Sequence, residues 1–411
     1  MKKINNRTMK ENNVRILLNT IRKKGPISRA ELAKELDLTS PAITSQTSEL
    51  LEKHLISEIG RIENHPTGRK PIMLSINPTA CYVMGLVMTN AFITVVLGDF
   101  AGEIHQQRKT AIDPALGRDR ILSRMIEELQ SMIDGSGIPR EQILALGVSA
   151  PGPLDSENGI LTAPPNFPDW RSVPICQILE RALGIPAVLD KESNAAALAE
   201  YYASDESDVP TFYILILRNS IGGCPMESSR ILRGFKDYSG DIGHMLVDIN
   251  GPQCTCGQFG CLECLASGNA LVRRTQAELK AFRNRNCAVE YDIETLTIED
   301  IVENARKGIP LFENVLEYAA QMMALAIGNI ITILCPGRFI LGGPFLDIYP
   351  EFLDRVAEQV HKRRYPYCVD EIRIERSRLG SEWYTKGAIM LALDCCQKRL
   401  CGEWRISENG G

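Results

Sequence analysis

The first 78 residues show the pattern of three short helices followed by two strands. Apolar residues recur at helical spacing over residues 12–24, and Gly25-Pro26 ends that helix. Ser28 and Glu31 have the spacing of a capping box, which predicts the start of a second helix. A tight turn and a third helix follow, so residues 28–53 are predicted to form a helix-turn-helix.

Two short extended stretches, residues 57–62 and 70–76, complete this head, and the polar loop between them predicts a wing. The third helix is the expected recognition helix, since its first turns carry short polar side chains that reach base edges. Its predicted DNA contacts are Ser40, Pro41, Thr44, Ser45 and Gln46. Arg69 and Lys70 at the tip of the wing are expected to contact phosphates or enter a minor groove.

Charge separates the head from the rest of the chain. Residues 1–78 hold 14 Lys and Arg against 8 Asp and Glu, a net charge of +6, whereas the remainder carries −11. A basic head is attracted to a polyanion such as DNA, and an acidic body is not. The alternative is a three-helix bundle used for protein contacts, but helix lengths, turn, wing and charge together favour DNA.

Beyond residue 78, buried strands alternate with helices. The predicted strands are 82–88, 93–98, 143–148, 187–189, 212–217 and 338–341, and the predicted helices are 121–133, 194–203 and 311–333. This alternation predicts an α/β body, and its length predicts two lobes. In such folds ligands bind at the loops that leave strand ends, which here follow Val148, Leu189 and Leu217.

Cysteine usage points to a metal. The sequence has 13 cysteines but shows no secretory signal and no run of eighteen apolar residues, so we expect a cytoplasmic protein with reduced thiols and no membrane partner. One imidazole and three thiolates fall close together, in the pattern of a tetrahedral zinc site. The predicted ligands are His244, Cys254, Cys256 and Cys261. Four protein ligands leave no open position, so the zinc is expected to be structural, against free thiols or a catalytic zinc as alternatives.

Several motifs resemble those of the ROK (repressor, ORF, kinase) family, in the family's order. They are Gly68-Arg69-Lys70-Pro71, residues 165–170, residues 194–200, Gly243-His244, the Cys-x-Cys-Gly-x-x-Gly-Cys-x-Glu run from Cys254, and Leu341-Gly342-Gly343. The resemblance covers nearly the whole chain and implies an actin-like, hexokinase-like, two-lobed body with a sugar bound in its cleft. The family includes sugar kinases without a DNA-binding head and repressors that carry one.

Both phosphate loops of the family's kinases are altered in this sequence. The kinases carry Asp-x-Gly-x-Thr after the first strand, where this chain has residues 85–92 without the Asp or the closely spaced glycines. A second loop, similar to Gly-Thr-Gly-Ile-Gly in kinases, is replaced by residues 218–223, Arg-Asn-Ser-Ile-Gly-Gly. Glycines let the backbone approach phosphates, so we expect no bound nucleotide, no catalytic residues and no kinase activity.

The resemblance also implies a set of sugar contacts, carried over motif by motif. They are Asn166, Glu192, Asp241, His244 and Glu263. The kinase motif Asn-Asp-Ala-Asn reads Lys191-Glu192-Ser193-Asn194 here, so a longer acid replaces the base and a Lys replaces a sugar-binding amide. Asp241 stands where the family usually has Glu. The alternative for each carboxylate is a solvated surface acid or a helix cap.

Three domains are predicted: a winged helix-turn-helix at 1–78, a first lobe at 79–193 completed by the helix 382–399, and a second lobe with the zinc motif at 194–381. The predicted function is a repressor of carbohydrate uptake or catabolism genes. It would bind operator DNA as a homodimer or dimer of dimers and respond to a sugar effector. Two alternatives stay open: an ATP-dependent sugar kinase with a regulatory head, and a repressor controlled by a protein partner.

Overall fold

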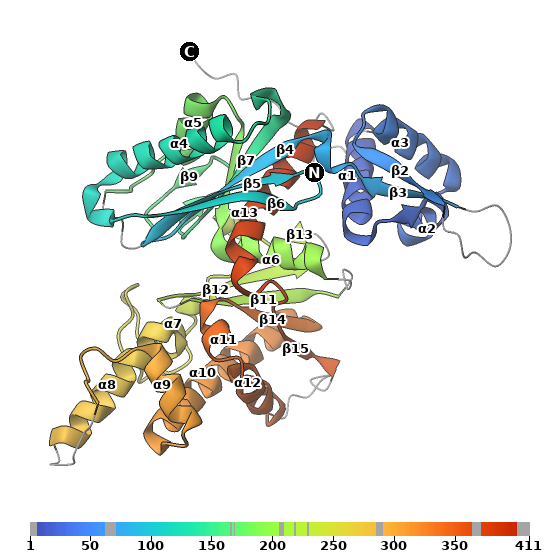
Figure 1. The fold of residues 1–411 in the computed structure, drawn as a ribbon. Helices are drawn as coiled ribbons and strands as arrows, with labels where there is room; N and C mark the ends of the chain where they lie inside the picture. The colour runs from blue at the N-terminus through green and yellow to red at the C-terminus, as the bar shows by residue number, and fades with distance from the viewer. Residues whose placement is uncertain are drawn as a thin grey trace. The chain divides into compact units, whose positions relative to one another are not determined.

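The computed structural model describes residues 6–61, 71–164, 167, 169–204, 209–217, 219–227, 230–284, 291–363 and 371–400. The chain divides into two compact units (Figure 1). Unit 1 comprises Met1–Asp205 together with Tyr384–Gly411, and unit 2 comprises Glu206–Trp383. Each unit contains one mixed five-stranded sheet, so the α/β fold class is confirmed.

Unit 1 begins with a winged helix-turn-helix. Its helices are α1 (Asn6–Lys24), α2 (Arg29–Glu35) and α3 (Ser40–Glu52), and its strands are β1 (Ile27–Ser28), β2 (Ile56–Arg61) and β3 (Ile72–Ile76). The strands pair antiparallel in the order β1-β3-β2. The predicted capping box is present: Glu31 N–H donates to the Ser28 hydroxyl, and Ser28 N–H donates to the Glu31 carboxylate at 2.8 Å. Local sequence signals therefore define this head.

Helix α1 begins six residues earlier than predicted, at Asn6. Residues 6–11 carry no apolar periodicity, so the pattern gave no sign that the helix extends through them. Its end agrees with the prediction. Gly25 N–H donates to the Ile21 carbonyl at 2.8 Å, and a Cβ on Gly25 would lie 2.5 Å from that oxygen, which is why only glycine fits this helix end.

The sheet of unit 1 has the strand order β10-β7-β4-β5-β6. Its strands are β4 (Tyr82–Met88), β5 (Phe92–Asp99), β6 (Ile104–Ala111), β7 (Ile143–Ala150) and β10 (Ala187–Lys191), and a small hairpin is formed by β8 (Leu154–Asp155) and β9 (Ile160–Leu161). β4, β5 and β6 form an antiparallel meander, while β7 and β10 continue the sheet in parallel with β4. β6 was not predicted, because its residues are mostly polar and carry no apolar alternation; five of the eight are exposed.

Helices cover both faces of this sheet. They are α4 (Arg118–Gly135), α5 (Ile175–Leu183), α6 (Glu192–Ala203) and α13 (Trp383–Leu400). Met84 and Leu86 of β4 share a core with α4 and α5, whereas Gly85 between them points to the opposite face and α13. In Figure 1, α4 and α5 accordingly lie on one side of the sheet and α13 on the other.

Glycines allow α13 to approach this sheet at backbone distance. A Cβ on Gly147 of β7 would lie 2.2 Å from the Ala388 carbonyl oxygen and 2.7 Å from Ala392 N. On the helix, a Cβ on Gly387 would lie 2.8 Å from the carbonyl carbon of Ala195 in α6. No side chain fits these contacts, so α13, α6 and the sheet form one closely packed layer.

The sheet of unit 2 repeats the same arrangement of strands. Its strands are β11 (Thr211–Ile216), β12 (Ile221–Glu227), β13 (Arg230–Ile231), β14 (Arg338–Gly342) and β15 (Arg373–Arg376). The order β13-β12-β11-β14-β15 again joins an antiparallel meander to two parallel strands. Numbered within each sheet, both orders read 5-4-1-2-3, which is the duplicated topology expected for the predicted actin-like body.

Helices of unit 2 surround a long apolar helix. They are α7 (Glu263–Ala266), α8 (Gly268–Asn284), α9 (Ile298–Arg306), α10 (Pro310–Leu334), α11 (Pro344–Ile348) and α12 (Phe352–His361). By length and composition α10 could cross a membrane, but its apolar residues form the centre of the unit 2 core, including Phe312, Met323 and Ile327. Packing inside a folded core therefore accounts for its hydrophobicity.

Short 3-10 helices complete the described chain: η1 (Pro78–Ala80), η2 (Pro114–Leu116), η3 (Arg140–Gln142), η4 (Phe235–Asp237), η5 (Ile242–His244) and η7 (Gly380–Glu382). All strands and helices predicted for the body are confirmed, with ends that agree within three residues. Helices α5, α7, α8, α9, α11 and α12 had not been predicted, nor had strands β8, β9, β12, β13 and β15.

Gly147→Ala is expected to lower the free energy of unfolding by about 1–3 kcal/mol, because the new Cβ overlaps the backbone of α13. Chemical denaturation measures the change. Gly135→Ala is the matched control, since Gly135 lies in helix α4 with nothing within 4 Å of its Cβ position, and alanine there should stabilise by about 0.5–1 kcal/mol. Equal stability of wild type and Gly147→Ala would contradict the close contact.

Candidate functional site

The DNA-facing surface of the head is the first part of α3. Ser40, Pro41, Thr44 and Ser45 are all exposed, as the sequence predicted they should be. Pro41 lies in the first turn, where its missing N–H removes no helical hydrogen bond. The Thr44 hydroxyl donates to the Ser40 carbonyl at 2.8 Å and keeps its lone pairs for a partner outside the head.

The structure does not bring Gln46 to this surface. Gln46 is 8% exposed and faces the head core together with Ile43, Thr47 and Leu50. Ser48, which sequence reasoning passed over, is exposed one turn after Thr44 and Ser45 on the same face. Its position follows from helical periodicity, a signal that was available in the sequence. The predicted wing-tip residues Arg69 and Lys70 lie outside the described residues.

One side chain from α2 links α3 to the wing. Arg29 Nε donates to the Thr47 hydroxyl at 3.1 Å, and its Nη2 donates to Glu58 of β2 at 3.0 Å. This arginine ties the two helices of the motif to the first strand of the wing. Its charge is therefore engaged within the head, and the polar face of α3 is left to contact a ligand.

A four-residue Cys/His cluster lies in unit 2, formed by the ligands predicted from the sequence. The ligand atoms of His244, Cys254, Cys256 and Cys261 all lie within 4.8 Å of one another. Cys254 Sγ is 3.7 Å from His244 Nδ1, and Cys256 Sγ is 3.7 Å from Cys261 Sγ. Tetrahedral zinc with Zn–S bonds of about 2.3 Å places its sulfur ligands about 3.8 Å apart, so the donor set and spacing fit such an ion.

Cys264 lies close to the cluster without joining it. Its Sγ is 3.0 Å from the Cys261 carbonyl oxygen and 3.5 Å from the Pro252 carbonyl oxygen, so its thiol is directed to backbone acceptors. Burial, followed by hydrogen bonds from Cys256 and Cys254, raises the pKa of Cys261 to about 12. A metal ion that binds this thiol as thiolate must therefore displace a proton.

Glycine and backbone hydrogen bonds shape the loop that carries the thiols. Gly260 N–H donates to the Pro252 carbonyl at 2.9 Å, and Cys254 N–H donates to Gln258 at 2.7 Å. Gly260 has φ +66°, and a Cβ there would lie 1.6 Å from the Asp248 carbonyl oxygen, so no other residue fits. The loop thus closes on itself and brings the thiols of residues 254–261 to one point.

Glu263 follows the last thiol of this loop and opens α7. Its Oε2 accepts a hydrogen bond from Ile221 N–H at 3.4 Å, and burial raises the pKa of its carboxyl group. His244 and Asp241 belong to the same part of unit 2, at the two ends of η5, and both are exposed. The structure therefore brings three predicted sugar contacts, Asp241, His244 and Glu263, to the neighbourhood of the cluster.

In unit 1 the predicted sugar contact is Glu192, the first residue of α6. Asp190, at the end of β10, supports this helix start: its Oδ1 accepts from Lys191 N–H at 2.8 Å and from Asn194 Nδ2 at 2.7 Å. Burial raises the pKa of Glu192 to about 7. Sequence reasoning missed Asp190, although it precedes the altered kinase motif directly. Asn166, the remaining predicted contact, lies outside the described residues.

Family patterns match both parts of this chain. The pattern of the ROK family matches residues 83–395, and a pattern described as winged helix-turn-helix DNA-binding matches residues 10–57. The chain belongs to the ROK family. A ROK body that follows a winged helix-turn-helix is the domain combination that the sequence motifs had implied.

Proteins similar to this ROK chain are named either as repressors and regulators or as sugar kinases. The xylose repressor of Bacillus subtilis (strain 168) is 26% identical over 389 residues, covering 94% of this chain and 96% of its own. A glucokinase of Halalkalibacterium halodurans is 24% identical and covers 73% of this chain and 90% of its own. A solved ROK family transcriptional regulator, described as a homologue of the Escherichia coli Mlc protein, has a TM-score of 0.78 at 24% identity and covers 96% and 98% of the two chains.

Coverage distinguishes the two kinds of relative. The repressor and the solved regulator extend over the head and the ROK body, whereas the glucokinase covers a smaller share of this chain. The comparison therefore favours a DNA-binding regulator over a sugar kinase, and the winged head supports the same conclusion.

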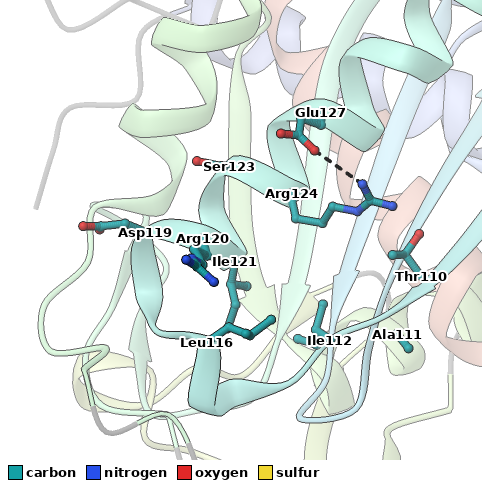
Figure 2. A pocket seen from close by; sticks show the side chains of 10 residues that line it. All are labelled: Thr110, Ala111, Ile112, Leu116, Asp119, Arg120, Ile121, Ser123, Arg124 and Glu127. Atoms are coloured by element: carbon teal, nitrogen blue, oxygen red, sulfur yellow. Dashed lines mark hydrogen bonds and ion pairs between the residues drawn. The ribbon is translucent and has the colours of Figure 1, made fainter.

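A pocket of about 540 Å³ lies elsewhere in this ROK chain, in unit 1 beside α4 (Figure 2). Its walls come from the end of β6, from η2 and from the first half of α4. The lining residues are Thr110, Ala111, Ile112, Leu116, Asp119, Arg120, Ile121, Ser123, Arg124 and Glu127. None of the predicted metal, sugar or DNA residues lines it, so it is separate from the candidate sites.

The raised pKa of Glu192 gives a pH dependence with a definite sign. Between its usual value of 4.5 and about 7, the folded chain keeps a proton that the unfolded chain has lost. The free energy of unfolding therefore contains a contribution that falls as the pH rises through this range. Glu192→Gln should remove that contribution, which is on the order of 2 kcal/mol between about pH 5 and about pH 8.

Urea denaturation of both proteins at the two pH values measures the difference. Subtracting the two curves cancels the contributions of all other groups, because both proteins contain them. A Glu192→Gln protein whose stability declines with pH as steeply as the wild type would show that Glu192 titrates normally.

Proposed function

We propose that this ROK protein is a cytoplasmic transcriptional repressor whose binding to operator DNA responds to a sugar. The observation that carries the proposal is the exposed polar face of α3 on a winged head, joined in one chain to a ROK body. A relative that covers 94% of this chain is named a xylose repressor. Two copies acting on a near-palindromic operator would follow the usual symmetry of such regulators.

The effector we propose is a pyranose bound by the carboxylates and the imidazole that the family motifs assign. Sugars are recognised through paired hydrogen bonds to carboxylates, and a missing hydroxyl leaves a buried acceptor unpaired. The raised pKa values of Glu192 and Glu263 support this role, since groups with perturbed pKa values concentrate at functional sites. D-xylose is the first candidate because relatives are named for it.

We propose that the Cys/His cluster binds one structural Zn²⁺. Four protein ligands leave no open coordination position, and thiolates with an imidazole are donors that zinc favours. Bound zinc would hold residues 244–261 in place and thereby fix Glu263, which follows the last ligand by two residues. His244 would bind through Nδ1, the atom nearest Cys254, which leaves Nε2 for the effector.

Kinase activity is not part of this proposal. The turn between β4 and β5, where family kinases have a phosphate loop, is closed by one side chain: the Thr89 hydroxyl accepts from Ala91 N–H at 3.3 Å and from Phe92 N–H at 3.1 Å. These two N–H groups therefore already donate hydrogen bonds within the turn. A phosphate cradle needs several backbone N–H groups that point to the ligand.

The second candidate function is an ATP-dependent sugar kinase with a regulatory head, which the glucokinase relative supports. A coupled ADP-release assay with D-xylose, D-glucose and N-acetyl-D-glucosamine distinguishes the two, because sustained turnover would identify an enzyme. Control by a protein partner is a third possibility, and it predicts DNA binding that no sugar changes.

The operator-binding prediction concerns the exposed face of α3. Thr44→Ala combined with Ser45→Ala should weaken binding to DNA from the protein's own upstream region by about 5- to 100-fold, the equivalent of about 1–3 kcal/mol for lost base contacts. Fluorescence anisotropy at fixed salt measures the affinity, with and without the three sugars. Glu141→Ala, an exposed residue of the body, is the control and should bind as the wild type does.

The sugar arm of the same titration tests the sensing claim. Wild-type affinity for the operator should change about fivefold or more with one of the sugars. Unchanged affinity with every sugar would refute sensing. Equal affinity of the α3 variant and the wild type would refute the assignment of the DNA-facing surface.

Metal content can be tested with a neighbouring thiol as control. Cys256→Ser should lose the bound zinc, which elemental analysis of the purified protein would find at about one per chain in the wild type, and its melting temperature should fall. Cys264→Ser should keep both, since the Cys264 thiol is directed to backbone carbonyls. Loss of zinc from Cys264→Ser but not from Cys256→Ser would show that Cys264, and not Cys256, is the zinc ligand.

A further inference from the structure

The head contacts the rest of unit 1 through the second half of α1, from Arg15 onward. Arg15 Nη1 lies 3.3 Å from Asp394 Oδ1 of α13. Arg22 donates from Nε and Nη2 to the Phe100 carbonyl at 3.2 and 3.0 Å, and its guanidinium carbon is 5.1 Å from the centroid of the Phe100 ring. Phe100 follows β5, so these bonds tie the head to the sheet and to its covering helix.

A third cation of α1 contacts α6. Lys23 Nζ is buried and lies 4.4 Å from the centroid of the Tyr201 ring, within the range of a cation–π interaction. Tyr201 packs edge-on against Tyr202, with ring centroids 5.3 Å apart. Burial raises the pKa of Tyr202 and lowers that of Arg22.

Helix α6 therefore carries a proposed sugar contact at one end and a contact with the head at the other. Glu192 is its first residue and Tyr201 lies in its last turn. Nine residues at 1.5 Å each separate them by about 14 Å. Between them, every residue from Ser193 to Glu200 is buried, and Ala195 touches the backbone of α13 at Gly387. Close packing of this kind has low compressibility and transmits strain from one end of the helix to the other.

We propose that α6 transmits effector binding to the DNA-binding head, and that Lys23 and Tyr201 are the positioning residues at the receiving end. When sugar binding shifts the first turn of α6, the Tyr201 ring at the other end of the helix is displaced. The cation–π contact of Lys23 with that ring then changes, and with it the orientation of α1. The recognition helix then meets the operator in a different position. The role of Glu192 rests on the proposed function, whereas the contact between α6 and the head does not.

The first arm of the test compares full-length variants at the Tyr201 end. For each protein, operator affinity is measured with and without D-xylose, D-glucose and N-acetyl-D-glucosamine, and the ratio gives the coupling. Tyr201→Leu and Lys23→Met should bring the ratio close to one while sugar binding, measured by calorimetry, stays within about twofold of wild type. Tyr201→Phe keeps the ring face and should restore the wild-type ratio, which a general loss of stability would not do.

The second arm needs no sugar. Operator affinity is measured for Glu192→Gln, for Tyr201→Leu and for the double variant at about pH 8, where the Glu192 carboxylate is charged. Substitutions this far apart normally combine additively, to within about twofold in affinity. Transmission through α6 predicts a departure from additivity of at least about fivefold. Additive effects, or no effect of Glu192→Gln, overturn the proposal.

The two arms separate the failure of this inference from the failure of the proposed function. A wild-type protein that responds to a sugar, with an unchanged ratio in Tyr201→Leu, refutes transmission through α6 and leaves sugar sensing intact. A wild-type protein that responds to no sugar refutes the proposed function. The second arm then decides the inference alone, since it depends only on DNA binding.

Discussion

The close contact between α13 and the sheet of unit 1 is the constraint on which the rest of that unit depends. Gly147 and Gly387 remove the side chains that would otherwise hold the helix away from β7 and from α6. The last described helix of the chain is thereby built into the unit that contains the first. Asp394 of α13 then meets Arg15, so the same contact that completes the body also provides part of the surface on which the DNA-binding head lies.

Those features that depend on short stretches of sequence could be predicted. Ser28 and Glu31 of the capping box are three residues apart, and the four metal ligands lie between residues 244 and 261. Such motifs can be recognised from residue types at short spacing alone. Gln46 was a misassignment that the sequence itself could have prevented. It lies three residues after Ile43 and four before Leu50, so helical spacing places it on the core face with them.

Features that depend on distant parts of the chain could not be predicted. β6 is a polar edge strand that is held by pairing with β5, so its residues carry no apolar alternation to reveal it. The bond between Arg15 and Asp394 joins residues 379 apart in sequence. The residues around either one give no sign of this pairing. The sugar contacts were carried over from family motifs for the same reason, since they are distributed over much of the chain.

The placement of α13 in unit 1 also has a consequence for biosynthesis. During translation the head and the first sheet emerge early, yet the helix that covers one face of that sheet is made only after the whole of unit 2. Domains generally fold as they leave the ribosome, beginning at the N-terminus. A nascent chain would thus expose the groove reserved for α13, together with a finished DNA-binding head, until the last stretch is synthesised. A chain shortened before α13 would keep the head but lack Asp394, the partner of Arg15.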